Sequence, residues 1–319
     1  MDLAAKEQSS GSAMSDLQKR LRNGTFVVTT ELSPPVSTDP SEFVERALAL
    51  RSLVAAVNVT DGAGSRAHMS SLAAAHFLVR NGVEPILQMT CRDRNRIALQ
   101  AELLGAAALG IRNILALRGD DPKLGDQPET KAVFDLDTAA LLATAQRMRD
   151  EGVLPSGVAI TGPVRLVLGA AELPVDPPPD WRPGGLLAKM RAGAEFIQTQ
   201  FCMDPDVVRR YAARLLDLGV AQKLPVLIGI AVIPSARSAR WMKEKLFGAI
   251  IPERIVERLE RAADPKAEGT SIAVELLQQL AETPGIAGAH VMAPTFHSGI
   301  GPSIQASGVA GRKRAPVGG

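Results

Sequence analysis

Residues 84–117 read EPILQMTCRDRNRIALQAELLGAAALGIRNILAL, and the order of elements in this stretch indicates the fold class. Its two ends, residues 84–90 and 112–117, are short aliphatic runs typical of buried strands. The segment between them, residues 94–109, has the length and the amphipathic pattern of a helix. A strand, a helix and a second strand in this order predict a β-α-β unit, because parallel neighbours in a sheet need a long crossover.

The same alternation continues on both sides of this unit. Strand-like runs occupy residues 26–32, 54–60, 164–170, 195–200, 225–230 and 288–292. Helical patterns follow at 40–50, 68–80, 138–151, 204–218 and 270–281. A further short helix is expected to end near residue 191, and two more lie between residues 235 and 263. Eight strands with helical crossovers predict a single-domain α/β protein, a (β/α)8 TIM barrel over residues 19–308. An open, doubly wound sheet is the alternative.

Composition narrows the class of protein further. The polar residues 1–18 predict a disordered leader, and residues 309–319 predict a flexible tail. The net charge of +2, from 36 basic and 34 acidic residues, gives no reason to expect nucleic acid or an anionic membrane surface as a partner. No apolar run reaches the ~20 residues of a membrane span. The 2 cysteines exclude a disulfide framework, so a cytoplasmic location is expected.

Polar residues collect where the predicted strands end. In a barrel the chemistry lies at the C-terminal ends of the strands, so these positions are the candidate site. They are Glu31, Thr60, Asp61, Gln88, Thr90, Arg118, Asp120, Glu172, Gln198 and Gln200.

Glu31 is the candidate general acid. It stands in TTELSPP, residues 29–35, where an apolar strand leaves the core. A carboxyl group held against aliphatic walls tends to keep its proton, which suits proton donation to a substrate. An ordinary surface glutamate at a strand end is the alternative.

The turn LRGDDP, residues 117–122, is the second candidate. Gly119 permits close approach of the backbone to a ligand, Arg118 can bind a phosphate, and Asp120 can hold negative charge in a cleft. An ordinary polar turn is the alternative. The neighbouring Asp93 is a candidate helix cap, and Cys91 is more typical of a small buried residue than of a nucleophile. The histidines have no metal-ligand spacing, so no metal site is expected, and no Gly-rich dinucleotide fingerprint follows the first strand.

Taken together, these segments resemble the methylenetetrahydrofolate reductase family. The matching stretches, in order, are TTELSPP at 29–35, NVTDGAGSR at 58–66, TCRDRNRIALQAELLGAAALGIRNILALRGDDP at 90–122, VFDLDTAALL at 133–142, LGAAELP at 168–174, KMRAGAEFIQTQFCMD at 189–204 and PVLIGIAVIPSA at 225–236. They cover nearly the whole predicted barrel.

The resemblance implies roles for individual residues. The proton donor of the family falls on Glu31, and the negative charge near flavin and pterin falls on Asp120. Gln200 falls on the glutamine that contacts folate, with Glu31 and Asp120 also in the substrate site. FAD, bound noncovalently, is implied to contact Thr60, Asp61, Ala63, Gln88, Arg118, Gly119, Asp120, Ala171 and Lys189.

The activity implied is reduction of 5,10-methylenetetrahydrofolate to 5-methyltetrahydrofolate by NADH or NADPH through the flavin, in a homo-oligomer. The sequence departs from the family pattern at Gln88, where a histidine is common, around Glu172-Leu173, at residues 181–185, and at 293–299, which contain no arginine. These departures fall at positions that the resemblance implies in binding of the flavin and of the folate tail. The alternatives are a folate-binding barrel that works without flavin or oxidises methyl-folate in one-carbon catabolism, and a non-catalytic partner of a methyltransferase.

Overall fold

The chain closes into a barrel of parallel strands in sequential order. The computed structural model describes residues 14–293 and 297–316. The strands are β1 (Val27–Leu32), β2 (Ala56–Val59), β3 (Pro85–Thr90), β4 (Asn113–Leu117), β5 (Val167–Glu172), β6 (Phe196–Phe201), β7 (Val226–Ala231) and β8 (Gly288–Met292). Because β1 pairs with β8, the sheet has no free edge. The predicted TIM barrel is therefore confirmed, and the open-sheet alternative is wrong.

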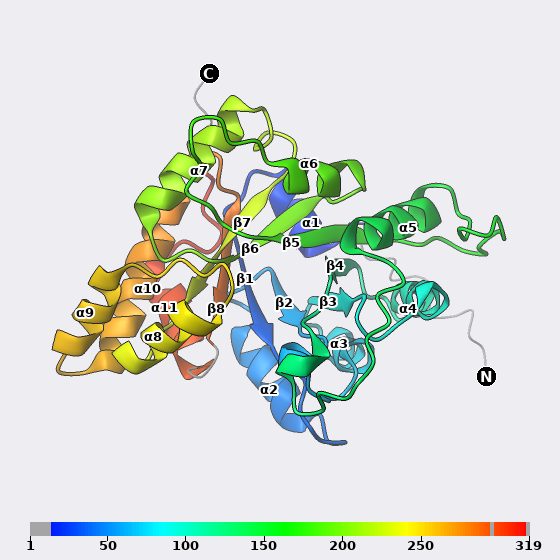
Figure 1. Cartoon of the computed structure of the whole chain (residues 1–319), viewed down its shortest axis with the longest axis horizontal. Helices are drawn as coiled ribbons and strands as arrows, with labels where there is room; N and C mark the ends of the chain where they lie inside the picture. Colours follow the sequence, from blue (N-terminus) through cyan, green and yellow to red (C-terminus); the bar gives the residue numbers. More distant parts are fainter. Residues whose placement is uncertain (1–13, 294–296, 317–319) are drawn as a thin grey trace.

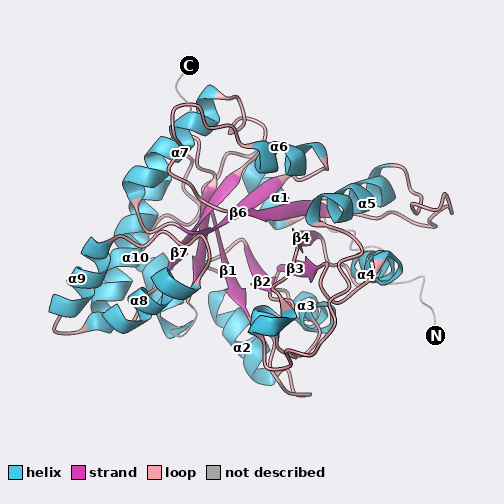
Figure 2. Ribbon diagram, viewed as in Figure 1, coloured by secondary structure: helices cyan, strands magenta, loops and turns pink. Residues whose placement is uncertain are grey.

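Helices form a layer outside the strands (Figures 1 and 2). They are α1 (Asp16–Arg22), α2 (Ser41–Leu50), α3 (Ser71–Arg80), α4 (Arg96–Ala108), α5 (Thr138–Asp150), α6 (Gly184–Arg191), α7 (Pro205–Asp217), α8 (Ala236–Lys245), α9 (Glu253–Arg261), α10 (Pro265–Ala281) and α11 (Ile300–Ser307). Short 3-10 turns lie at η2 (Ala63–Ser65), η3 (Pro122–Leu124) and η4 (His297–Gly299). Within the described ranges, no helix combines the length and apolar character needed to cross a membrane.

The interior of the barrel is filled by alternate residues of each strand, because successive side chains of a strand point to opposite faces. Near the N-terminal ends these residues form an apolar cluster that contains Val27, Ile86 and Leu115. Phe196 is fully buried in it, and a Cβ added to Gly169 would lie 2.2 Å from the ring of Phe196. The absence of a side chain at Gly169 thus leaves room for Phe196 to fill the barrel floor.

The predicted leader is wrong at its C-terminal end, because helix α1 begins inside it. Ser15 caps this helix by accepting from the backbone N–H of Gln18, and the Glu84 carboxylate accepts from the N–H groups of Asp16 and Leu17. Leu17 and Leu21 are buried in the same cluster as the barrel floor. The helix therefore closes the N-terminal end of the barrel, while residues 1–13 of the predicted leader lie outside the described residues.

The predicted flexible tail also differs from the structure, because residues 309–316 are attached to the barrel. Val309 is fully buried, and the N–H of Phe26 donates to the carbonyl of Arg312 at 2.7 Å. Lys313 pairs with Thr25 in an isolated antiparallel bridge. The compact unit thus extends from Ser15 past residue 308, and residues 317–319 of the tail lie outside the described part of the chain.

Candidate functional site

The C-terminal mouth of the barrel contains a cavity of about 440 Å³. The alternation that places Val27 in the floor places Thr29 above it and Glu31 at the mouth, and the same step of two leads along β6 from Phe196 to Gln198 and Gln200. The cavity is lined by Glu31, Gln88, Leu115, Leu117, Ala171, Glu172, Leu173, Lys189, Gln198, Thr199, Gln200, His290 and Met292. The predicted residues Glu31, Gln88, Ala171, Lys189 and Gln200 therefore share one cavity.

Glu31 faces a histidine that sequence reasoning missed. Its Oε2 lies 3.7 Å from Nε2 of His290, and the two side chains are 30% and 4% exposed. The register explains the meeting, because Thr29 pairs with His290 across β1 and β8 and Glu31 follows two residues later. The carboxyl group is therefore open to the cavity and has a titratable partner behind it.

Behind His290 lies a buried chain of hydrogen bonds. The Thr29 hydroxyl is 2.9 Å from His290 Nδ1 and accepts from Gln198 Nε2 at 3.0 Å. Gln198 in turn exchanges two hydrogen bonds with the Asn58 side chain, at 2.7 and 3.1 Å. A threonine hydroxyl has one donor and two acceptor sites, so Thr29 can accept from Gln198 and still bond His290 Nδ1 in either tautomer of the ring. The network thus fixes the imidazole that faces the candidate acid.

Lys189 and Glu172 form an ion pair in the cavity wall. Lys189 Nζ donates to the Glu172 carboxylate at 3.0 Å and to the carbonyl of Ala171 at 2.7 Å. Both side chains are 21% exposed. In the described part of the chain, Lys189 is the only lysine or arginine that lines this cavity. An anionic part of a ligand that enters here consequently meets one cation that already has a carboxylate partner.

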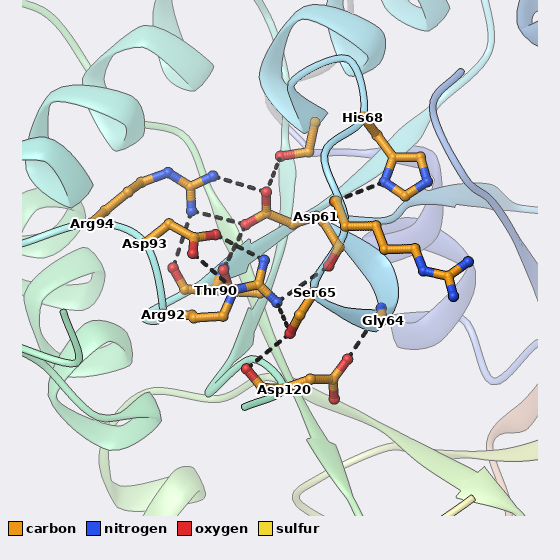
Figure 3. A network of polar contacts seen from close by, with 12 residues as sticks. Asp61, Gly64, Ser65, His68, Thr90, Arg92, Asp93, Arg94 and Asp120 are labelled. Atoms are coloured by element: carbon orange, nitrogen blue, oxygen red, sulfur yellow. Dashed lines mark hydrogen bonds and ion pairs between the residues drawn. The ribbon is translucent and has the colours of Figure 1, made fainter. Parts of the chain in front are cut away.

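Asp120 lies in the loop after β4 and does not line the cavity, and residues of the loop after β2 bond to it (Figure 3). Its carboxylate accepts from the N–H of Gly64 at 3.2 Å, and its carbonyl accepts from the Ser65 hydroxyl at 3.2 Å. Ser65 has a φ of 55°, and a Cβ on Gly125 would lie 2.1 Å from the Ser65 carbonyl oxygen. This tight contact between the two loops fixes the backbone on which Asp120 stands.

Asp61 is buried, and its carboxylate is bonded to other residues of the protein. It accepts from Arg94 through both oxygens at 2.8 Å and from the N–H of Thr90 at 2.8 Å. Burial alone would raise the pKa of Asp61, but the Arg94 guanidinium and the Thr90 hydrogen bonds outweigh it and hold the pKa below its usual range. In this structure Asp61 therefore braces β2 against β3 and the start of α4.

The remaining predicted residues lie in the loops after β2 and β4 and do not line the cavity. Thr60 is buried, and its hydroxyl donates to the Ser33 side chain at 3.0 Å, whereas Ala63 is exposed in η2. The Arg118 guanidinium lies 4.6 Å from the centre of the Phe134 ring. Gly119 has a φ of 90°, and a Cβ there would lie 2.8 Å from the Cβ of Arg92. The turn after β4 is thus compact, with Arg118 exposed beside it.

These residues fit a flavin at its ring end. Leu115, Leu117 and Met292 offer an apolar surface, and the Gln88 amide offers a donor and an acceptor for a flat heterocycle. At the phosphate end the fit depends on Lys189, whose charge Glu172 compensates, and on the exposed Arg118. The site therefore suits the ring of the cofactor and supplies little uncompensated positive charge for its phosphates.

Two predicted interpretations of the turn after β3 are resolved. Asn95, and not Asp93, caps α4 by accepting from the N–H groups of Ile97 and Ala98, while Asp93 pairs with Arg92. Burial raises the pKa of the Cys91 thiol to about 11, which fits the prediction of a small buried residue. Among the described residues, no group of three or more His, Cys, Asp or Glu side chains could hold a metal ion.

Comparisons with known proteins agree with this geometry. A family model described as methylenetetrahydrofolate reductase matches residues 16–296. Methylenetetrahydrofolate reductase 2 of Schizosaccharomyces pombe is 29% identical over 266 residues, which cover 82% of this chain and 41% of that protein. This chain thus spans less than half of that relative. The 5,10-methylenetetrahydrofolate reductase of Pectobacterium carotovorum is 25% identical, over 81% of this chain and 88% of that protein.

Among solved structures that share the fold, one has a folate bound. It is an uncharacterised protein from Clostridium thermocellum that binds two copies of 5-methyl-5,6,7,8-tetrahydrofolic acid. The TM-score is 0.62 at 12% identity, and the match covers 91% of this chain and 97% of that one. At this identity the likeness establishes the fold alone.

Proposed function

The chain belongs to the methylenetetrahydrofolate reductase family, and from this premise we propose that it reduces 5,10-methylenetetrahydrofolate to 5-methyltetrahydrofolate. The observation that carries the proposal is Glu31 in the wall of a 440 Å³ cavity, with His290 behind it and leucine side chains in the same cavity. A pterin is flat, apolar on its faces and polar at its edge, so this lining suits it.

Glu31 is the proposed general acid. In its protonated form it donates to N10 of the substrate as the bond between N10 and the bridging methylene carbon breaks. The product of this step is an iminium at N5, and addition of a hydride to the methylene carbon gives the N5-methyl group. His290, whose Nε2 lies 3.7 Å from Glu31 Oε2, is proposed to help return a proton to Glu31 between turnovers.

Asp120 and Gln200 are proposed to act on the same substrate. A negative charge near the substrate favours the cationic iminium, which is the role assigned to Asp120. Gln200 is proposed to bind the polar edge of the pterin, because its amide lines the cavity next to Gln198.

FAD is the proposed cofactor, held noncovalently by Thr60, Ala63, Gln88, Arg118, Gly119, Asp120, Ala171 and Lys189. Asp61 contributes indirectly, because its carboxylate is bonded to Arg94 and Thr90. Bound there, FAD would supply the hydride-transfer chemistry that links NADH or NADPH to folate. A cytoplasmic location and a homo-oligomeric state are part of the same proposal.

A turnover experiment tests this function. The purified chain is incubated without oxygen with methylene-folate and NADH or NADPH, with and without added FAD, and 5-methyltetrahydrofolate is measured by chromatography. We expect the amount of 5-methyltetrahydrofolate formed to equal the amount of NADH or NADPH oxidised. We also expect the protein to be yellow once FAD is supplied. Full turnover in demonstrably flavin-free protein would remove FAD from the proposal, and no product under any condition would remove the reductase function.

A further inference from the structure

Glu172 lies where an anionic ligand group would otherwise meet Lys189. Its Oε2 accepts from Lys189 Nζ at 3.0 Å, and its Oε1 accepts from the backbone N–H of Leu173 at 3.1 Å. Lys189 Nζ has three donors, of which the structure engages one with Glu172 and one with the Ala171 carbonyl. One donor of the only ammonium group that lines this cavity therefore remains for a ligand, within the described residues.

The start of α6 lies beside this pair. A Cβ on Gly185 would lie 3.5 Å from Glu172 Oε2, so the carboxylate is close to the first turn of the helix. The cap residue Pro183 makes no side-chain hydrogen bond to this turn. A helix N-terminus favours negative charge, and the nearby Glu172 carboxylate supplies it. Lys189 and the N-terminus of α6 could each attract a phosphate at this wall, and both already lie beside the Glu172 carboxylate.

We propose that Glu172 is an internal anion that competes with the phosphate or carboxylate groups of a ligand for Lys189, and so limits the affinity of the cavity for anionic ligands. The inference rests on the proposed function, which supplies two such ligands, a flavin nucleotide and a folate. It predicts a sign: removal of the Glu172 charge strengthens binding of anionic ligands and leaves neutral ones unchanged.

The expected size follows from the pair itself. Both partners are 21% exposed, so their interaction is only partly screened by water. Freeing one charged hydrogen bond for the ligand corresponds to an affinity gain of about tenfold. A change of this size is measurable by equilibrium titration.

The test compares flavins that share one ring system and differ in their phosphate groups: FAD carries a pyrophosphate and an adenosine, FMN carries a single phosphate, and riboflavin carries none. Full-length protein freed of any bound flavin is titrated with FAD, FMN and riboflavin, and binding is followed by flavin fluorescence. Glu172→Gln keeps the shape of the side chain and removes its charge. We expect it to bind FAD and FMN about tenfold more tightly than the parent does, and riboflavin, which has no phosphate, equally well.

Two further variants distinguish an effect of the Lys189–Glu172 ion pair from a general effect of the protein's charge. Asp176→Asn removes one negative charge from the same loop, outside the cavity, and should leave all three affinities unchanged. Lys189→Met should weaken FMN binding, and in its presence Glu172→Gln should give no gain, because the competition needs Lys189. Thermal unfolding of each variant shows whether it is folded.

The contrary outcomes are distinct. Unchanged or weaker FAD and FMN binding by Glu172→Gln overturns the inference, and so does an equal gain for riboflavin. If the parent binds no flavin, the cofactor part of the proposed function fails, and the comparison is repeated with 5-methyltetrahydrofolate and a tetrahydropterin that lacks the glutamate. A gain for the folate alone then supports the inference, whereas no gain, or no binding of either ligand, overturns it.

Discussion

Replacing Glu31 with Gln removes one transferable proton and little else. The amide keeps the volume of the side chain, and the contact with His290 is 3.7 Å, longer than a hydrogen bond. With the side chain 30% exposed, the loss of this contact should change stability by at most about 1 kcal/mol. Loss of general acid catalysis, by contrast, should slow folate reduction by about 10²–10⁴-fold.

The assay separates the two halves of the reaction. Nicotinamide oxidation with an artificial electron acceptor does not need the proton of Glu31, so the variant should perform it at nearly the parental rate. Reduction of methylene-folate should fall by the full factor. Glu42→Gln, on the exposed face of α2, is the matched control and should leave both rates unchanged.

A Glu31→Gln enzyme that reduces methylene-folate at the parental rate would show that Glu31 is not the general acid and would leave it as an ordinary residue at a strand end. Equal loss of both half-reactions would indicate misfolding or cofactor loss instead, and thermal unfolding together with flavin content would identify which.

Four further substitutions have defined outcomes. Asp120→Asn should slow folate reduction in rapid-mixing assays while the melting temperature stays within a few degrees; unchanged turnover would make Asp120 a turn residue only. Arg118→Ala should raise the dissociation constant of FAD, measured by fluorescence, and equal retention would exclude a phosphate contact. Asp61→Asn should cost about 1–3 kcal/mol in urea unfolding, because Arg94 loses one of its two carboxylate partners and keeps only Glu102. The parent should also lose this stability as pH falls below 3.8, the ordinary pKa of Asp61, toward its lower folded value, and a parallel acid profile in Asp61→Asn would contradict the shift. Leu17→Ala should cost about 2–5 kcal/mol, and no change would show that α1 does not close the barrel.

The sequence predicts the barrel well because the pattern is repeated. Each strand is a short aliphatic run next to a helix, so every unit supports the same fold, and the predicted strands overlap the observed ones throughout. Helix α1 was missed because its only apolar residues are Leu17 and Leu21, and a single pair among polar residues does not give a recognisable helical pattern. The start of α10 was placed late, since Asp264 and Pro265 form an N-terminal cap and first turn that the apolar pattern does not mark.

The candidate site was predicted in part for a related reason. Strand ends identify residues at the mouth, and Glu31, Gln88 and Gln200 were found in this way. His290 was missed because it stands before the end of its strand, although the step of two from Met292 points to it. The pairing of Lys189 with Glu172 depends on how α6 packs beside β5, which no local pattern encodes.

Binding of 5-methyltetrahydrofolate to a cavity-filling variant tests whether folate binds in the mouth of this barrel. Ala171 lines the cavity, so Ala171→Phe should occupy the space of the pterin, whereas Ala263→Phe, in the exposed turn between α9 and α10, should not. We expect saturable binding in calorimetry for the parent and for Ala263→Phe, and loss of binding in a folded Ala171→Phe. Undiminished binding by Ala171→Phe, or none by the parent, would contradict a folate site at the mouth of this barrel.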